Sequence, residues 1–352
     1  MTIQKLKDLK IGKLICYLIC YLAIVSPGYA VFTKLGMAGM PFLKIGVGRA
    51  TGMADAFVAV ANDASATYWN PAGLALLKNR EVLINHIDWI LETRHEFLAG
   101  VFPTKLGVLG ISVTSVNLGD FEETTIDKYQ GTGRTFSASD LCAGVSFARM
   151  FTDRFAFGTS VKVIQERVWE ISASTVAFDF GTYYNTGWQN VRLAMAIANF
   201  GPDTRFSGRQ LDFTVKTRDD WTWPWTWQPI PASYMTEKFP LPITFRFGIA
   251  NDFTLTGKDK LTFACDLTHF NDVNEKINFG LEYSIMNISL RGGYILNTDT
   301  QYAEDILWRT GISFGAGFVV KPVEYLVFRV DYGYRDVGRL GISHRITLGV
   351  SY

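Results

Sequence analysis

The sequence predicts an all-β transmembrane barrel of about 14 antiparallel strands, with a partly helical N-terminal plug inside the lumen. Three observations lead to this prediction. Most segments alternate between apolar and polar residues, short and long connections alternate between them, and the chain opens with an export signal. Charged residues make up 19% of the chain and aromatic residues 14%, which fits a protein whose outer surface meets lipid.

Residues 1–30 have the pattern of a cleaved secretory signal peptide. Lysines at positions 5, 7, 10 and 13 precede an apolar core over 14–25, and Gly28-Tyr29-Ala30 supplies the small residues of a signal-peptidase site. The core is too short for a membrane anchor, which needs about 20 apolar residues. We therefore expect export through the inner membrane and a mature chain that starts at Val31. Whether the two remaining cysteines, Cys142 and Cys265, form a disulfide stays open at this point.

Period-two alternation predicts the strands of a barrel over residues 80–352. In 276–285 every odd residue is apolar and every even residue is polar or glycine, and 342–352 alternates in the same way up to Tyr352. An even number of strands can close without leaving an unpaired edge in lipid. We place strands over 81–91, 95–103, 107–118, 137–150, 154–166, 174–185, 190–200, 242–252, 259–270, 275–285, 288–297, 308–320, 324–335 and 342–352.

The connections between these strands fall into two kinds. If the first strand runs outward from the periplasm, the periplasmic turns are 103–105, 152–153, 186–188, 286–287 and 321–323, with a longer one at 254–259. The opposite connections include 119–136, 201–241 and 297–307, although the first, near Thr93, is tight. Short periplasmic turns and longer extracellular loops are typical of outer-membrane barrels, so the expected location is the bacterial outer membrane.

The polar face of each strand is expected to line the lumen, because a charge on the lipid face near the midplane costs a few kcal/mol. One interpretation is a network of paired arginines and carboxylates, and the other is an anion-attracting interior for carboxylate-bearing cargo. Glycines on the same face make room for a segment packed inside, and we expect residues 31–79 to be that plug. The predicted lumen charges are Arg246, Arg291, Arg309, Arg329, Arg345, Asp266, Glu282 and Asp331.

The most specific motif is FLKIGVGRATGMADAFVAVANDASATYWNPAGL at residues 42–74. Small residues over 54–61 predict a short helix, 63–65 can start a further turn, and Asn70-Pro71 ends the helical stretch. The segment resembles the PorV/PorQ family, a branch of the superfamily of the long-chain fatty-acid transporter FadL, in FLKIGVG, GMADA, NDA and NPAGL. The superfamily's Asn-Pro-Ala plug signature is matched by Asn70, Pro71 and Ala72, with Gly73 following.

The resemblance implies one of two functions without catalysis or a cofactor. PorV-like members hold cargo proteins at the outer membrane for type IX secretion, whereas FadL-like members pass hydrophobic molecules through a plug-gated barrel. The many lumen charges favour a PorV-like role in type IX-like secretion or surface attachment. The alternative is a FadL-like channel for hydrophobic small molecules such as fatty acids. The expected partners are outer-membrane lipid and either secretion-system proteins or hydrophobic cargo.

Enzymatic and nucleic-acid functions have little support in the sequence. There is no G-x-S-x-G motif and no pair among the four histidines at metal-ligand spacing, so we expect neither catalysis nor a metal. The formal net charge of +1 gives no electrostatic footprint for nucleic acid.

An unusual tryptophan strip lies in the connection over residues 201–241. It is either a membrane-interface belt or lid, or a surface that grips a hydrophobic ligand or a partner protein. The strip consists of Trp221, Trp223, Trp225 and Trp227.

Overall fold

A computed structural model of the chain describes residues 38–90, 93–218, 227–254, 259–297, 311–338 and 341–352. For residues 216–218, 227–229 and 297 it describes the backbone only. The predicted signal peptide and the start of the predicted plug therefore lie outside the described residues. Residues 36–352 form one compact unit that holds both the barrel wall and the plug.

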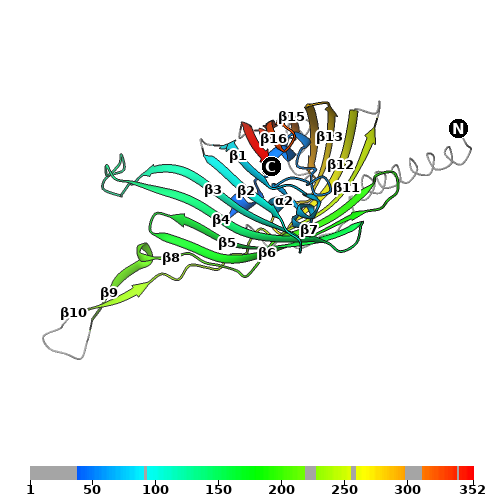
Figure 1. Cartoon of the computed structure of the whole chain (residues 1–352). Helices are drawn as coiled ribbons and strands as arrows, with labels where there is room; N and C mark the ends of the chain where they lie inside the picture. The colour runs from blue at the N-terminus through cyan, green and yellow to red at the C-terminus, as the bar shows by residue number, and fades with distance from the viewer. Residues whose placement is uncertain (1–37, 91–92, 219–226, 255–258, 298–310, 339–340) are drawn as a thin grey trace, which may run out of the picture. The chain divides into compact units, whose positions relative to one another are not determined.

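Fourteen antiparallel strands of the described chain close into a barrel (Figure 1). Each strand pairs with its neighbours in sequence, β1 pairs with β17, and the connection from β7 leads to β11. All fourteen predicted strands are present, with ends that differ by a few residues. They are β1 (Glu81–Asp88), β2 (Arg94–Pro103), β3 (Val108–Glu122), β4 (Thr135–Met150), β5 (Phe155–Val168), β6 (Ile171–Asn185), β7 (Arg192–Phe200), β11 (Thr244–Thr254), β12 (Asp259–Phe270), β13 (Lys276–Ile285), β14 (Ile288–Asn297), β15 (Ile312–Val323), β16 (Leu326–Asp336) and β17 (Ile342–Ser351).

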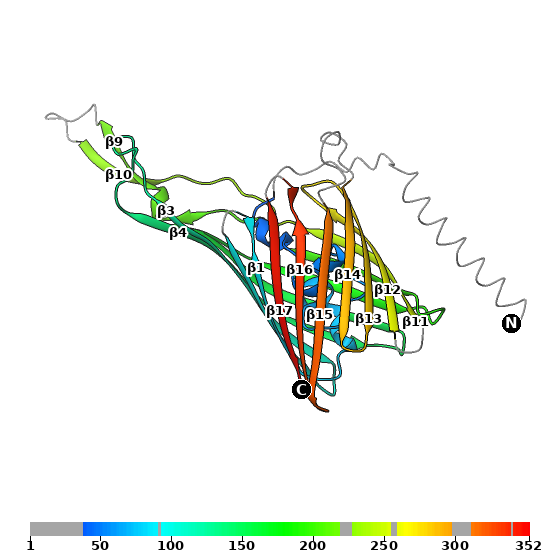
Figure 2. The same ribbon diagram turned by 90° about the horizontal axis from the view of Figure 1, so that it is seen from above.

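The two ends of the barrel differ in their connections. We call the end where Glu81 pairs with Ser351 the turn end, and the opposite end the loop end. Figure 2 shows the C-terminus among the turns at the turn end. Connections at the turn end are short, as predicted, but those at the loop end are mixed. The β5–β6 connection is a tight turn, in which Trp169 has a φ of 55° and stacks on Phe136.

The long β7–β11 connection contains strands that the sequence did not predict. Short β8 (Ser207–Gly208) pairs with β6, and β9 (Asp212–Arg218) pairs only with β10 (Trp227–Ser233). Between β8 and β9 lies the 3-10 helix η5 (Arg209–Leu211). The β9–β10 hairpin is separate from the barrel sheet because neither of its strands pairs with a barrel strand.

The outward face of the wall is apolar. Val145, Val163 and Leu290 are each 57% exposed, and their neighbours around the wall are also large and apolar. Exposure of this much contiguous apolar surface is unfavourable in water and favourable in lipid. None of the described helices is long and apolar enough to cross a membrane.

Within the described residues, the plug inside the lumen contains four short helices joined by turns. They are η1 (Pro41–Lys44), η2 (Gly48–Met53), α2 (Ala66–Trp69) and η3 (Pro71–Leu76). The helix predicted over 54–61 is wrong, because this stretch is a series of turns. Ala54 and Asp55 have φ values of 53° and 64°, which a right-handed helix does not allow. The N–H groups of Phe57 and Val58 donate to Asp266 of β12 instead of to helical carbonyls.

Candidate functional site

Asn70 joins the end of the plug to the barrel wall. Its backbone leaves the helical region after α2, with φ −161°, and its side-chain oxygen accepts from the N–H of Ala72 at 3.1 Å, which caps η3. The amide nitrogen donates to the carbonyls of Val58 at 3.1 Å and Thr182 at 3.0 Å. Pro71 fits the first position of η3 because no N–H is needed there. Asn70 is fully buried, so it holds plug helices and β6 together.

Glycines of the wall let the plug backbone lie directly on the strands. A Cβ at Gly158 or Gly181 would overlap Asn70, Pro71 or the amide of Ala72. Gly73 of the motif lies against the Ala61 carbonyl in the same way. Under η2 and the turn that follows it, four further glycines form a matching strip. These are Gly280, Gly293, Gly315 and Gly333.

A ring of six alternating charges ties the plug to the other side of the wall. From the plug, Arg49 contacts Asp63 at 2.8 Å and Glu282 of β13 at 3.1 Å. Arg291 of β14 continues the ring to Glu282 at 2.5 Å and to Asp331 of β16 at 2.7 Å. Arg329 closes it, at 3.2 Å from Asp331 and 3.4 Å from Asp63, and also binds Glu81 at 2.9 Å. Each charge in this ring therefore has an opposite partner on both sides.

Asp63 of the plug is ionised by its surroundings. Burial alone raises its pKa, but the guanidinium groups of Arg329 and Arg49 outweigh burial and lower the pKa to about 2. Ser65 also donates to this carboxylate through its backbone N–H, at 3.0 Å. At neutral pH the Asp63 carboxylate is therefore charged and can bind Arg329 of the wall.

Two of the other predicted lumen charges, Arg246 and Arg345, also contact the plug. Arg246 lies over the rings of Tyr68 and Trp69, with its guanidinium carbon 5.3 and 5.1 Å from the ring centroids. Arg345 donates to the Gly46 carbonyl and, at 2.8 Å, to Thr51. Arg309 lies outside the described residues. The predicted network of paired arginines and carboxylates thus describes the charges of the ring. Arg246 and Arg345 instead contact aromatic rings, a carbonyl or a hydroxyl group of the plug.

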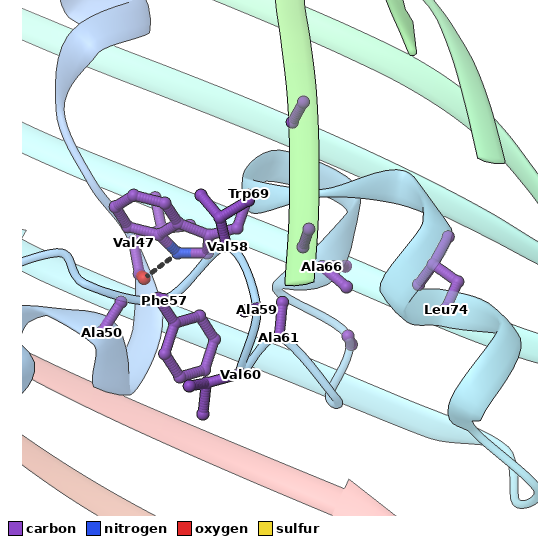
Figure 3. Close-up of a cluster of buried hydrophobic side chains, with 14 of the residues drawn as sticks. Val47, Ala50, Phe57, Val58, Ala59, Val60, Ala61, Ala66, Trp69 and Leu74 are labelled. Atoms are coloured by element: carbon purple, nitrogen blue, oxygen red, sulfur yellow. Dashed lines mark hydrogen bonds between the residues drawn. The ribbon is translucent and has the colours of Figure 1, made fainter. Parts of the chain in front are cut away.

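The plug and the inward face of the wall share an apolar core. Figure 3 shows Trp69 and Phe57 side by side, with the Trp69 indole donating to the Val47 carbonyl at 2.9 Å. Their ring centroids lie 6.1 Å apart in an edge arrangement. Small side chains around them, such as Ala59 and Ala61, allow the turns to pack closely. The small residues over 54–61 therefore allow close packing of turns and do not form a helix.

A second apolar cluster fills the lumen towards the loop end. We call it the loop-end cluster. The start of the plug packs there against the inward faces of β1 and β3–β6, and Leu241, Phe206 and Phe239 complete it from the β7–β11 connection. Its buried members are Met40, Phe42, Leu43, Ile45, Ile87, Val116, Cys142, Ile164, Ala173, Ala177 and Leu241. Cys142 and Cys265 are not joined by a disulfide.

The wall beside the loop-end cluster is irregular. The β6–β7 ladder shifts register at Phe178–Phe180, and beyond it the start of β6 pairs with β8. Thr204 and Phe239 form a single bridge across the same region. We call this stretch, residues 199–208 and 236–241, the seam. A cavity of about 450 Å³ lies along it, lined by Ser172, Ser174, Arg205 and Lys238 among others.

The tryptophan strip is only partly within the described residues. Trp221, Trp223 and Trp225 lie outside them, and Trp227 begins β10 without a described side chain. The two interpretations of this strip therefore remain predictions.

The sequence missed several residues that hold the plug. Arg49, Asp63 and Glu81 were not predicted as site residues, although all three are central to the charge ring or attached to it. The signal that could have found Arg49 and Asp63 is a pair of opposite charges within an otherwise small and apolar motif. Among the described residues, no group of three histidine, cysteine, aspartate or glutamate side chains is arranged to hold a metal.

Comparison with known proteins gives one family model and several solved structures. Residues 34–174 match the model of an uncharacterised protein family, UPF0164. No curated protein matches the chain.

Three solved channels share the fold. The Pseudomonas putida toluene transporter TodX matches with a TM-score of 0.53 at 13% identity, over 90% of this chain and 98% of that one. The Ralstonia pickettii toluene transporter TbuX gives 0.52 at 12%, over 92% and 99%. The monoaromatic hydrocarbon channel CymD gives 0.51 at 12%, over 91% and 98%. The chain therefore has the same barrel fold as these three proteins.

Proposed function

We propose that this protein is an outer-membrane channel for hydrophobic small molecules. The observation that carries the proposal is the loop-end cluster, in which the plug and the wall bring apolar side chains together inside the lumen. Apolar side chains with a few polar groups at the edge are the usual lining of a small-molecule site. The likeness of the fold to hydrocarbon channels supports the same conclusion.

The lumen charges, which favoured secretion in the sequence, have another explanation. Four of these charges, together with Arg49 and Asp63 of the plug, form the ring that binds the plug to β13, β14 and β16. A polar lumen is thus a means of holding the plug and is no argument for protein cargo. The comparisons give no support to a PorV/PorQ-like role, so we favour the channel.

Passage through the barrel requires part of the plug to move. Residues 40–45 cover the loop-end cluster, whereas Asn70 and the charge ring hold the remainder. We infer that a ligand enters at the loop end and displaces this first part of the plug. The seam lies beside the cluster, and its ladder is interrupted by a register shift and by the change of partner from β7 to β8, so it is an irregular part of the described wall.

The test is uptake of a radiolabelled alkylbenzene by cells that carry the protein in their outer membrane. Ala177→Trp places a large ring in the loop-end cluster, where Ala177 is fully buried on β6. Ala143→Trp on the exposed face of β4 is the matched control. We expect uptake with wild type and the control and little above background with Ala177→Trp.

Two results would contradict the proposal. One is uptake that does not depend on the protein. The other is an Ala177→Trp variant that folds in the outer membrane and transports as well as Ala143→Trp. Deleting the gene and comparing surface proteins tests the secretion alternative: lost surface proteins with unchanged hydrophobe uptake would favour secretion.

A further inference from the structure

Two carboxylates face each other inside the loop-end cluster. Asp140 of β4 pairs in register with Glu166 of β5, and both point into the lumen. Asp140 is 7% exposed. Like charges directly opposite each other on adjacent strands are destabilising, and burial in apolar surroundings adds to the cost.

Asp140 has no basic or hydrogen-bonding partner among the described side chains, and Glu166 has no basic one. Glu166 accepts a backbone hydrogen bond from Met40 at the start of the plug. Lys162 lies on β5 but is committed to Asp179 at 2.5 Å. This pair differs from the carboxylates of the charge ring, each of which binds an arginine.

The surroundings of the pair are apolar. Val116 lies opposite Asp140 on β3, and Ala173 lies opposite Glu166 on β6. Cys142 and Ile164 follow on the same inward faces, and all four belong to the loop-end cluster. The carboxylates are thus a polar edge of an apolar site.

His95 is an independent sign that a ligand group is missing here. His95 of β2 pairs with Val116 of β3, and Val116 pairs with Asp140 of β4, so the three residues form one row across neighbouring strands. The ring is fully buried, and neither nitrogen has a hydrogen-bond partner among the described residues. A neutral imidazole has one nitrogen that accepts, so His95 adds an unused acceptor to the row.

The basic residue of this row is too far away to neutralise the carboxylates. Arg345 pairs with Ile87 of β1, four strands from Asp140. Four strand spacings correspond to about 19 Å along the wall. Arg345 also donates to the plug at Gly46 and Thr51.

We propose that Asp140 and Glu166 bind the ammonium group of an amphipathic cation whose apolar body occupies the loop-end cluster. The substrate class is then hydrophobic amines rather than neutral hydrocarbons alone. An ammonium offers three donors and a positive charge, which matches two carboxylates, while the unused acceptor of His95 lies two strands from Asp140 in the same apolar cluster. This inference rests on the proposed channel function and names its substrate class.

The test compares three ligands with one apolar body: 4-butylbenzylamine, 4-butylbenzyl alcohol and 4-butylbenzoate. Binding to the purified full-length barrel in a nonionic detergent is measured by titration calorimetry. We expect wild type to bind the amine about tenfold more tightly than the alcohol, since charge-assisted hydrogen bonds are stronger than neutral ones, and the benzoate most weakly.

Substitution assigns the preference to the two carboxylates. Asp140→Asn with Glu166→Gln should bind the amine and the alcohol equally. The control, Asp120→Asn with Glu122→Gln, removes the same charge from exposed positions on β3 and should keep the preference. Heat-modifiable gel mobility shows that each variant is a folded barrel.

The outcomes separate the two proposals. If the alcohol binds wild type as tightly as the amine and Ala177→Trp abolishes both, the channel stands and the amine preference is wrong. An amine preference that survives in the Asp140–Glu166 variant also overturns the inference. If none of the three ligands binds, the proposed function itself fails.

Discussion

Replacement of Asn70 by alanine should loosen the end of the plug from β6. The N–H of Ala72 loses its cap, which costs about 1 kcal/mol. The carbonyls of Val58 and Thr182 lose their donor while they remain buried, and each costs about 1 kcal/mol or more. The sum is about 3 kcal/mol, or roughly a 100-fold larger open population.

Hydrogen exchange with mass spectrometry measures this population directly. The backbone N–H groups of residues 72–76 in η3 exchange when the plug opens locally, so their rate reports the opening free energy. We expect about 100-fold faster exchange there in Asn70→Ala, with unchanged protection in β4. Asn287→Ala, in the exposed β13–β14 turn, is the matched control.

The reasoning is refuted if η3 in Asn70→Ala exchanges within threefold of wild type while the barrel stays folded. Faster exchange in β4 as well would also refute it, because the loss would then be one of global stability. Only a change confined to the plug supports Asn70 as the residue that fastens it to β6.

The same exchange measurement tests three further contacts of the plug. Gly181→Ala places a Cβ 2.9 Å from Pro71 and against Asn70, so exchange should rise about tenfold or more. The control Gly292→Ala meets nothing within 4 Å and should change little. Between about pH 5 and pH 2, wild type should lose up to about 2 kcal/mol of plug stability. Asp63 contributes fully above its ordinary pKa of 3.8, and this contribution is lost as the pH falls through its folded pKa of about 2. Asp63→Asn should therefore reduce this pH dependence, and a variant as pH-sensitive as wild type would exclude Asp63 as one of its sources. Arg49→Met and Glu282→Gln should each speed hydrogen exchange in the plug. The loss of opening free energy in the double variant should be about 1–3 kcal/mol smaller than the sum of the two single losses. Strict additivity would show that Arg49 and Glu282 are not coupled.

Period-two alternation was enough to predict the barrel. A strand with one face in lipid must alternate, so the pattern gives both the strand and the face of each residue, and residues 276–285 and 342–351 were placed to within a residue. It also placed Arg291, Asp331 and Glu282 on the lumen face, where they are buried. The helix over 54–61 failed because small residues also suit tight turns, and a carboxylate from β12 took the backbone N–H groups that a helix would use.

The sequence by itself determined the number of strands, their faces and the position of the plug motif, because these follow from local periodicity and from turn residues. Only the tertiary structure decided which charges pair and which remain alone. Arg329 and Glu81 are 248 residues apart and meet through the β1–β17 closure, whereas Asp140 and Glu166 face each other across one hairpin without a cation. Local patterns cannot encode such partners, because closing the ring and folding the plug into it fixes the three-dimensional neighbours of each inward side chain.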